Sequence, residues 1–398
     1  MTTTMSTTMT TAAEDRLTEL DWVRIAAFGL LIVYHVGMFY VSWDWHVKSP
    51  HPVVALETWM QLSSPWRMGL LFVVSGAASG LMLGRGSAAG GAGARSARLL
   101  LPLLLGMALI VPPQPYLEVV QKLGYSGSYL DFLARYYAAD RSFCPDKKCL
   151  VLPTWNHLWF LAYLWVYTML LLGAQRLSGG AWLVSPRWQV LTRGARLLWV
   201  PWLLFALVRL TLLRSFPSTH NLTWDWFNHG LFAGMFVLGA GLFGHACDRH
   251  GAWAAALRLR WWALAGAVVL LTAMPRCLEA LGGWEALPHW GQQAWLVLGG
   301  ARHWLPVVAA LGFARKHLRG RDGPWRRTLT EAVFPFYIVH QTLIVVAAYH
   351  LVRLGWPQGL EALALVALTA AGCTATYLLV RQVGWLRPWF GMPRAGVR

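Results

Sequence analysis

Apolar runs of membrane-spanning length recur along most of this 398-residue chain. An α-helix needs about 20 predominantly apolar residues to cross the hydrocarbon core of a bilayer. Hydrophobic residues make up 57% of the sequence and charged residues only 13%, which argues against a water-soluble protein. Because backbone groups in lipid must be hydrogen-bonded within the chain, apolar runs of this length fold as helices. The sequence therefore predicts an all-α polytopic membrane protein.

The runs predict about ten transmembrane helices that form one membrane domain. We expect a disordered tail at residues 1–16, a transmembrane domain at 17–390 and a short cytoplasmic tail at 391–398. The longest connection, 114–154, is expected to cover the outer mouth of a cavity, because loops of this length usually have a function. The expected spans are 22–41, 65–83, 98–113, 155–173, 197–213, 229–247, 261–275, 293–313, 331–350 and 359–380.

Basic residues between the spans indicate the topology. With the N-terminus placed in the cytoplasm, the segments on that side hold about twice as many Lys and Arg residues as the opposite segments. Both termini are then expected to be cytoplasmic. The formal net charge of +17 is explained by this orientation against an anionic inner leaflet. No motif typical of nucleic-acid binding accompanies it.

Cysteines and histidines show no metal-binding spacing. The sequence contains no CxxC, HxxxH or HExxH pairing, so we expect no metal site. Cys144 and Cys149 lie in the connection that the topology places outside. They either form a disulfide, if that side is an oxidising compartment, or remain two free thiols.

The first apolar run contains Arg24 at its entry and His35 deep within it. In a helix the two residues lie about 16 Å apart along the axis, which places His35 near the middle of the bilayer or beyond. A titratable ring at that depth points to a function, since a neutral imidazole can take a proton from a hydroxyl group. The alternative is a histidine that only hydrogen-bonds a neighbouring helix. Asp21 shares a helix face with Arg24, where an ion pair is its simplest role.

Two further basic groups are candidates for holding a negatively charged donor. Arg95 and Arg98 precede the third run at a spacing that puts both guanidinium groups on one helix face. They suit the phosphates of a CoA thioester held from the cytoplasm, or they are ordinary anchors. Arg67 begins the second run and is either a donor-binding cation or an interface anchor. Ser75 in that run hydrogen-bonds either a substrate or its own helix backbone.

A group of polar and aromatic residues opens the fourth run. Asn156, His157 and Trp159 lie at its external side. They suit an interface belt of amphipathic side chains. They equally suit recognition of a sugar, because an indole face stacks on a sugar ring.

The ninth run contains a second intramembrane histidine, His340. Tyr337 lies three residues before it and shares its helix face, and Glu331 precedes both near the cytoplasmic edge. A second histidine at depth supports a polar cavity in the membrane, although His340 alone is as easily a structural residue.

Several short motifs, taken together, resemble the membrane-bound acyltransferase 3 family. Two departures are Ile25 where the family has Gly, and Leu71 where it has the first Phe of a pair, and neither removes a reactive group. The matching motifs are Leu20-Asp21-Trp-Val-Arg24, the ten residues between Arg24 and His35, Phe72-Val-Val-Ser75-Gly76, Arg95-x-x-Arg98 followed by Pro102, His157-Leu-Trp-Phe-Leu, and Tyr337-x-x-His340.

The resemblance implies an integral-membrane O-acyltransferase in a bacterial inner membrane. It would move an acyl group, acetyl or succinyl, from a cytoplasmic acyl-CoA to a hydroxyl of an extracytoplasmic or lipid-linked glycan. Within the family the chain is most similar to proteins that place such groups on periplasmic glucans. No bound cofactor is implied, since acyl-CoA is a substrate. The residues implied are His35, Arg24 and Asp21 in catalysis, Arg95, Arg98, Arg67 and Ser75 at the donor, and Asn156, His157, Trp159, Tyr337, His340 and Glu331 at the acceptor or cavity.

The alternative function is a glycan or lipid transporter or flippase without acyl-transfer chemistry. Polar residues at mid-membrane depth also mark transport pathways. A transporter of this kind predicts inverted repeats with broken half-helices in matching positions, and the sequence shows no convincing pair.

Overall fold

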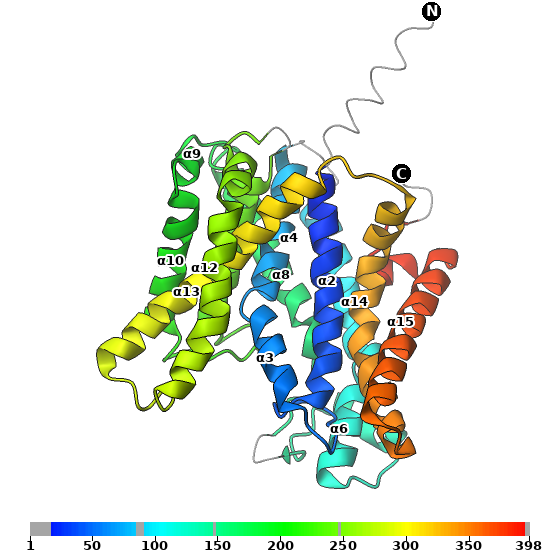
Figure 1. Cartoon of the computed structure of the whole chain (residues 1–398). Coiled ribbons are helices and arrows are strands. Elements are labelled where there is room, and N and C mark those ends of the chain that lie inside the picture. The colour runs from blue at the N-terminus through cyan, green and yellow to red at the C-terminus, as the bar shows by residue number, and fades with distance from the viewer. Residues whose placement is uncertain (1–16, 85–90, 146–148, 246–247, 395–398) are drawn as a thin grey trace, which may run out of the picture. The chain divides into compact units, whose positions relative to one another are not determined.

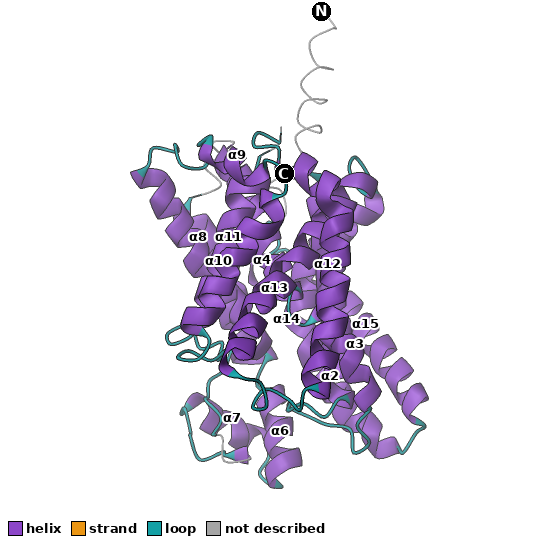
Figure 2. Ribbon diagram, turned by 60° about the vertical axis from the view of Figure 1, so that its left-hand side comes forward, coloured by secondary structure: helices purple, strands orange, loops and turns teal. Residues whose placement is uncertain are grey.

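The computed structural model describes residues 17–84, 91–145, 149–245 and 248–394. The expected tail at 1–16 and residues 395–398 lie outside these ranges. Within the described residues the chain is helical and contains no strand, which confirms the all-α prediction (Figure 2). The helices are α2 (Thr18–Tyr40), α3 (Val54–Ser63), α4 (Arg67–Gly84), α5 (Ala92–Leu105), α6 (Pro113–Leu123), α7 (Tyr129–Tyr137), α8 (Trp159–Leu177), α9 (Arg187–Thr192), α10 (Arg196–Leu212), α11 (Trp226–Leu238), α12 (Ala252–Ala280), α13 (His289–His317), α14 (Pro324–Leu351) and α15 (Gln358–Gln382), with π-helical turns at Gly106–Ile110 and Gly239–Phe243 and 3-10 turns at Asn156–Leu158, Val352–Leu354 and Arg387–Phe390.

Nine helical segments of the described chain are long and apolar enough to cross a membrane. The expected span 197–213 is helix α10, whose 17 residues make it one residue shorter than the shortest of the nine. The nine segments are Thr18–Tyr40, Val54–Gly84, Ala92–Leu123, Asn156–Leu177, Trp226–Phe243, Ala252–Ala280, His289–His317, Pro324–Leu354 and Gln358–Gln382.

The long connection 114–154 is more ordered than a loop. Helix α6 begins with a proline at its first turn and ends at Gly124, whose φ of 65° is left-handed and suits glycine. Helix α7 starts with a capping box between Ser128 and Asp131. Cys144 and Cys149 form a disulfide, which decides between the two states that the sequence left open.

The chain divides into two compact units. Unit 1 comprises residues 1–27, 61–92 and 166–330, and unit 2 comprises residues 28–60, 93–165 and 331–398. Helix α2 contributes its first residues to unit 1 and the remainder, from Phe28 onward, to unit 2.

Unit 1 is a bundle in which α13 packs against both α10 and α12, and α11 packs against α4. Small residues bring α4 close to the backbone of α11. A Cβ atom added to Gly76 would lie 2.0 Å from the carbonyl oxygen of Phe236, so glycine is needed there.

Unit 2 is organised around the second half of α2, which lies beside α14 and α15 (Figure 1). Phe39 of α2 and Ile344 of α14 are fully buried in the shared core, together with Leu365 of α15. The end of α2 is fixed by Lys48, whose ammonium group donates hydrogen bonds to the carbonyl oxygens of Met38 and Val41. Burial lowers the pKa of Lys48 to about 8. The core and this cap hold the histidine-bearing part of α2 against α14.

Candidate active site

The two intramembrane histidines of the sequence form a direct pair in unit 2. His35 lies on α2 and His340 on α14, and Nδ1 of His35 is 2.8 Å from Nε2 of His340. The rings stack with centroids 5.0 Å apart. His340 is fully buried, whereas His35 is half-buried. Two residues that are 305 positions apart in sequence are therefore hydrogen-bonded to each other.

The hydrogen-bond network assigns the tautomers of this pair. Nδ1 of His340 lies 2.8 Å from the carbonyl oxygen of Tyr337 and 3.2 Å from that of Phe336. Carbonyl oxygens only accept hydrogen bonds, so Nδ1 of neutral His340 carries the hydrogen and Nε2 carries the lone pair. Nδ1–H of His35 then donates to Nε2 of His340. The lone pair of neutral His35 is consequently on Nε2, the atom that can take up a proton or an acyl group.

His157 and Tyr337 fix the neighbourhood of His340. Nε2 of His157 donates to the carbonyl oxygen of Ile338 at 3.0 Å, and the hydroxyl of Tyr337 donates to the carbonyl oxygen of His157 at 2.7 Å. The rings of His157 and His340 are edge to face with centroids 5.1 Å apart. The structure thus brings together four of the predicted residues, His35, His157, Tyr337 and His340.

A row of amide side chains continues from these histidines. Gln114 is fully buried, and its Oε1 accepts hydrogen bonds from Nδ2 of Asn156 and from Nε2 of Gln341, each at 2.9 Å. Its Nε2 donates to the hydroxyl of Thr342 at 2.7 Å. Asn156 was predicted as a site residue, whereas Gln114 was placed at the start of a loop and missed.

The row ends at a histidine–carboxylate pair that the sequence reasoning also missed. Nδ1 of His46 is 2.6 Å from Oε2 of Glu118, and Nε2 of Gln341 is 3.1 Å from Nε2 of His46. The other carboxylate oxygen of Glu118 accepts from Lys122 at 3.0 Å, and Lys122 also binds Asp44 at 2.7 Å. The side chains of His46 and Glu118 are 16% and 9% exposed. Two sequence features could have pointed to this pair. His46 lies just after the first span, and Glu118 lies in a short helix that follows prolines.

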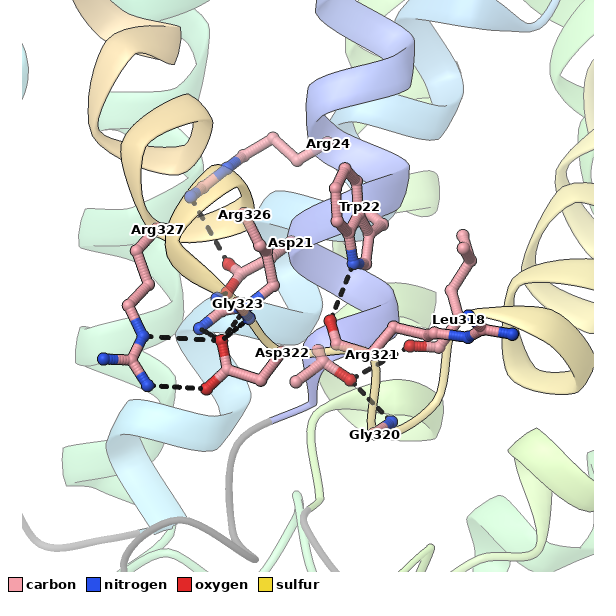
Figure 3. A network of polar contacts seen from close by, with 11 residues as sticks. Asp21, Trp22, Arg24, Leu318, Gly320, Arg321, Asp322, Gly323, Arg326 and Arg327 are labelled. Atoms are coloured by element: carbon pink, nitrogen blue, oxygen red, sulfur yellow. Dashed lines mark hydrogen bonds and ion pairs between the residues drawn. The ribbon is translucent and has the colours of Figure 1, made fainter.

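Asp21 and Arg24 belong to a different network, in unit 1 (Figure 3). The predicted ion pair between them is present, with Nη2 of Arg24 3.5 Å from Oδ1 of Asp21. Asp21 also pairs with Arg326, which in turn binds Asp322 at 2.7 Å. The Arg326 side chain is only 1% exposed. Asp21 therefore neutralises a buried guanidinium group besides meeting Arg24.

The four predicted donor residues are divided between the units. Arg67 and Ser75 lie on α4 in unit 1, and Arg67 is buried. Arg95 and Arg98 lie on α5 in unit 2. The guanidinium of Arg98 lies 5.6 Å from the ring centroid of Phe334, a cation–π contact that fixes its direction.

Two predicted cavity residues, Glu331 and Trp159, contact side chains outside the histidine pair. Glu331 accepts hydrogen bonds from Arg387 at 2.8 Å and from the hydroxyl of Tyr377 at 3.2 Å. Trp159 packs edge to face on Tyr163, with centroids 5.1 Å apart. Across the described residues, no group of three or more His, Cys, Asp or Glu side chains is arranged to hold a metal ion.

A histidine pair whose hydrogen bonds assign the lone pair of His35 to Nε2, within a bundle of apolar helices, suits acyl transfer within a membrane. The family model described as an acyltransferase domain matches residues 17–381, so the chain belongs to the acyltransferase 3 family. Among curated proteins the chain is similar to Glucans biosynthesis protein C of Escherichia coli O6:K15:H31 and of Escherichia coli O157:H7, with 29% identity over 152 residues in each case. The matched stretch covers 38% of this chain and spans 37% of the length of each relative. No solved structure matches the chain.

Proposed function

We propose that this acyltransferase moves an acyl group, acetyl or succinyl, from a cytoplasmic acyl-CoA to a hydroxyl group of an extracytoplasmic or lipid-linked glycan in a bacterial inner membrane. The observation that carries the proposal is the His35–His340 pair, which orients the lone pair of His35 Nε2 within unit 2. The name of the similar curated proteins, Glucans biosynthesis protein C, supports a glycan as the acceptor.

The chemistry requires the acyl carbon to exchange sulfur for oxygen. A new carbon–oxygen bond forms to the glycan, the carbon–sulfur bond of the thioester breaks, and the hydroxyl proton leaves the oxygen. His35 serves this exchange through Nε2, either by taking that proton or by carrying the acyl group. His340 keeps the ring in the required tautomer, as a carboxylate does for the histidine of a catalytic triad.

Arginines on α5 are the proposed contacts for the donor. Arg95 and Arg98 are three positions apart and lie on one helical face. Planar guanidinium groups match phosphate oxygens in two-point contacts, which suits the phosphates of coenzyme A. The distribution of basic residues between the spans supports a cytoplasmic position for this end of α5, where acyl-CoA is available.

The test uses purified protein in proteoliposomes with a radiolabelled acyl-CoA and a glucan acceptor. His35→Gln is expected to lower label transfer by at least about 100-fold. His350→Gln changes an exposed histidine of α14 and is expected to transfer at the normal rate. Undiminished acylation by the His35 variant would remove this residue from the reaction. Wild-type protein that neither releases coenzyme A thiol nor labels the glucan would instead favour the transporter.

A further inference from the structure

Unit 2 contains two histidines whose partners differ in charge. Nδ1–H of His35 is held by the neutral imidazole of His340, whereas Nδ1 of His46 faces the Glu118 carboxylate at 2.6 Å. A carboxylate on Nδ1 stabilises the imidazolium that forms when Nε2 takes a proton, and a neutral ring gives no such charge stabilisation. His46 is therefore the better placed of the two to accept a proton.

The contacts of His46 leave its Nε2 able to receive a substrate hydroxyl. The amide nitrogen of Gln341 donates one hydrogen to His46 Nε2 at 3.1 Å and one to Gln114 Oε1 at 2.9 Å. A hydroxyl group that displaces the longer of these bonds leaves Gln341 still paired with Gln114. Glu118 stays in place because Lys122 holds its second oxygen. The positions of nitrogen and oxygen in the Gln341 amide are assigned from these hydrogen bonds taken together.

Both histidines lie close to one indole in the chain segment that leaves α2. The Trp45 ring has centroid separations of 6.5 Å from His35 and 5.7 Å from His46. His46 comes after the last residue of α2, on the side of His35 away from Arg24. The expected positive-inside topology makes this the extracytoplasmic side, which is the side of the proposed acceptor. Indoles such as Trp45 and the half-buried Trp43 offer flat apolar faces for a sugar ring.

We propose that His46, oriented by Glu118, takes the proton of a carbohydrate hydroxyl, while His35 carries the acyl group between donor and acceptor. This rests on the proposed acyltransferase function. First, Nε2 of His35 bonds to the acyl carbon, and the carbon–sulfur bond breaks with its electron pair on the thiolate of coenzyme A. Next, the hydroxyl oxygen bonds to the acyl carbon, its proton moves to Nε2 of His46, and the carbon–nitrogen bond breaks to restore His35. His46 then releases the proton to water, and the thiolate takes up a proton from water.

The proposal separates two half-reactions that can be measured independently. His46→Gln keeps an amide that can donate to Glu118 and accept from Gln341, so the network is preserved. Release of coenzyme A in a single turnover and transfer of radiolabelled acyl group to glucan are followed in proteoliposomes. His46→Gln is expected to release coenzyme A at the wild-type single-turnover rate, to hold label on the protein, and to transfer it to glucan about 100-fold more slowly or worse.

Matched variants make the outcome decisive. Glu118→Gln is expected to show the same split, and His51→Gln, an exposed histidine of the same connection, is expected to behave as wild type. His35→Gln should lose both half-reactions. Equal losses of thiol release and transfer in His46→Gln, or normal transfer, would overturn the division of roles and leave the proposed acyltransfer intact. Absence of thiol release by the wild type would overturn the proposed function itself.

Discussion

The two units of this protein bury polar side chains in different ways. In unit 1, Arg326 is enclosed by the carboxylates of Asp21 and Asp322, and Arg315 pairs with buried Glu19. In unit 2, the pair of His35 and His340 is bonded through neutral rings and backbone carbonyls. The Arg326 and Arg315 networks of unit 1 neutralise fixed charges, whereas the histidine pair of unit 2 positions groups whose protons can move.

Helix α2 carries residues of both kinds: Asp21 belongs to an ion-pair network, and His35 belongs to the histidine pair. A guanidinium group stays charged at any physiological pH, so its ion pairs hold α2 in place without taking part in proton transfer. A neutral imidazole with one assigned lone pair gains or loses a proton with little rearrangement. We therefore expect substitutions in the unit 1 network to change mainly stability, and substitutions around His35 to change mainly the rate of acyl transfer.

The largest effect is expected when the buried ion pair of unit 1 is broken. Arg326→Ala removes the guanidinium between Asp21 and Asp322 and is expected to lower the free energy of unfolding by about 3–5 kcal/mol. Unfolding in detergent, followed by circular dichroism, measures it. Arg327→Ala is the matched control, because that side chain binds the same Asp322 but is 69% exposed. Equal destabilisation by the two variants would contradict the assignment of stability to the buried pair.

Much of the fold follows from the sequence because hydrophobic runs directly report membrane-spanning helices. The departures have local causes. Helix α10, with 17 residues, is one residue shorter than the shortest of the nine membrane-spanning segments. The connection 114–154 was assigned to a loop because α6 and α7 are short and amphipathic. Their caps, a proline at the start of α6 and Gly124 at its end, were visible signals.

The candidate site was only partly predictable, because depth in the membrane identifies a costly residue but not its partner. His35, His157 and His340 stood out as imidazoles in or beside apolar runs. Gln114 and Glu118 did not, since they lie within the first turns of a helix that the hydrophobic pattern does not reveal. Pairing between residues 72 positions apart, as in His46 and Glu118, depends on how helices pack and has no local signature.

An intermediate effect, on rate, is expected in unit 2. His340→Phe removes the acceptor for Nδ1–H of His35 and is expected to slow acyl transfer about 10- to 100-fold, the usual cost of losing a group that orients a histidine. That range corresponds to about 1.4–2.7 kcal/mol of transition-state stabilisation. Transfer to glucan in proteoliposomes measures it, with unfolding monitored alongside. His340→Gln retains an acceptor oxygen and should recover part of the rate. A rate loss no larger than the loss of folded protein would assign His340 to stability alone.

The smallest effect is expected at the exposed edge of the unit 1 network, and it depends on pH. The guanidinium groups of Arg327 and Arg326 hold the pKa of the Asp322 carboxyl well below its usual range, which is about 3.9 in an unfolded chain. Because the folded-state value is depressed, the carboxylate stabilises the fold above about pH 4 and loses this contribution as the pH falls further.

Asp322 is 41% exposed, so Asp322→Asn should cost about 0.2–1 kcal/mol at pH 7. The difference in the free energy of unfolding between Asp322→Asn and wild type should shrink when unfolding is measured at successively lower pH from pH 5. In an Arg327→Ala background this difference should shrink less steeply. A difference that stays constant with pH would show that the Asp322 ion pairs contribute no measurable stability.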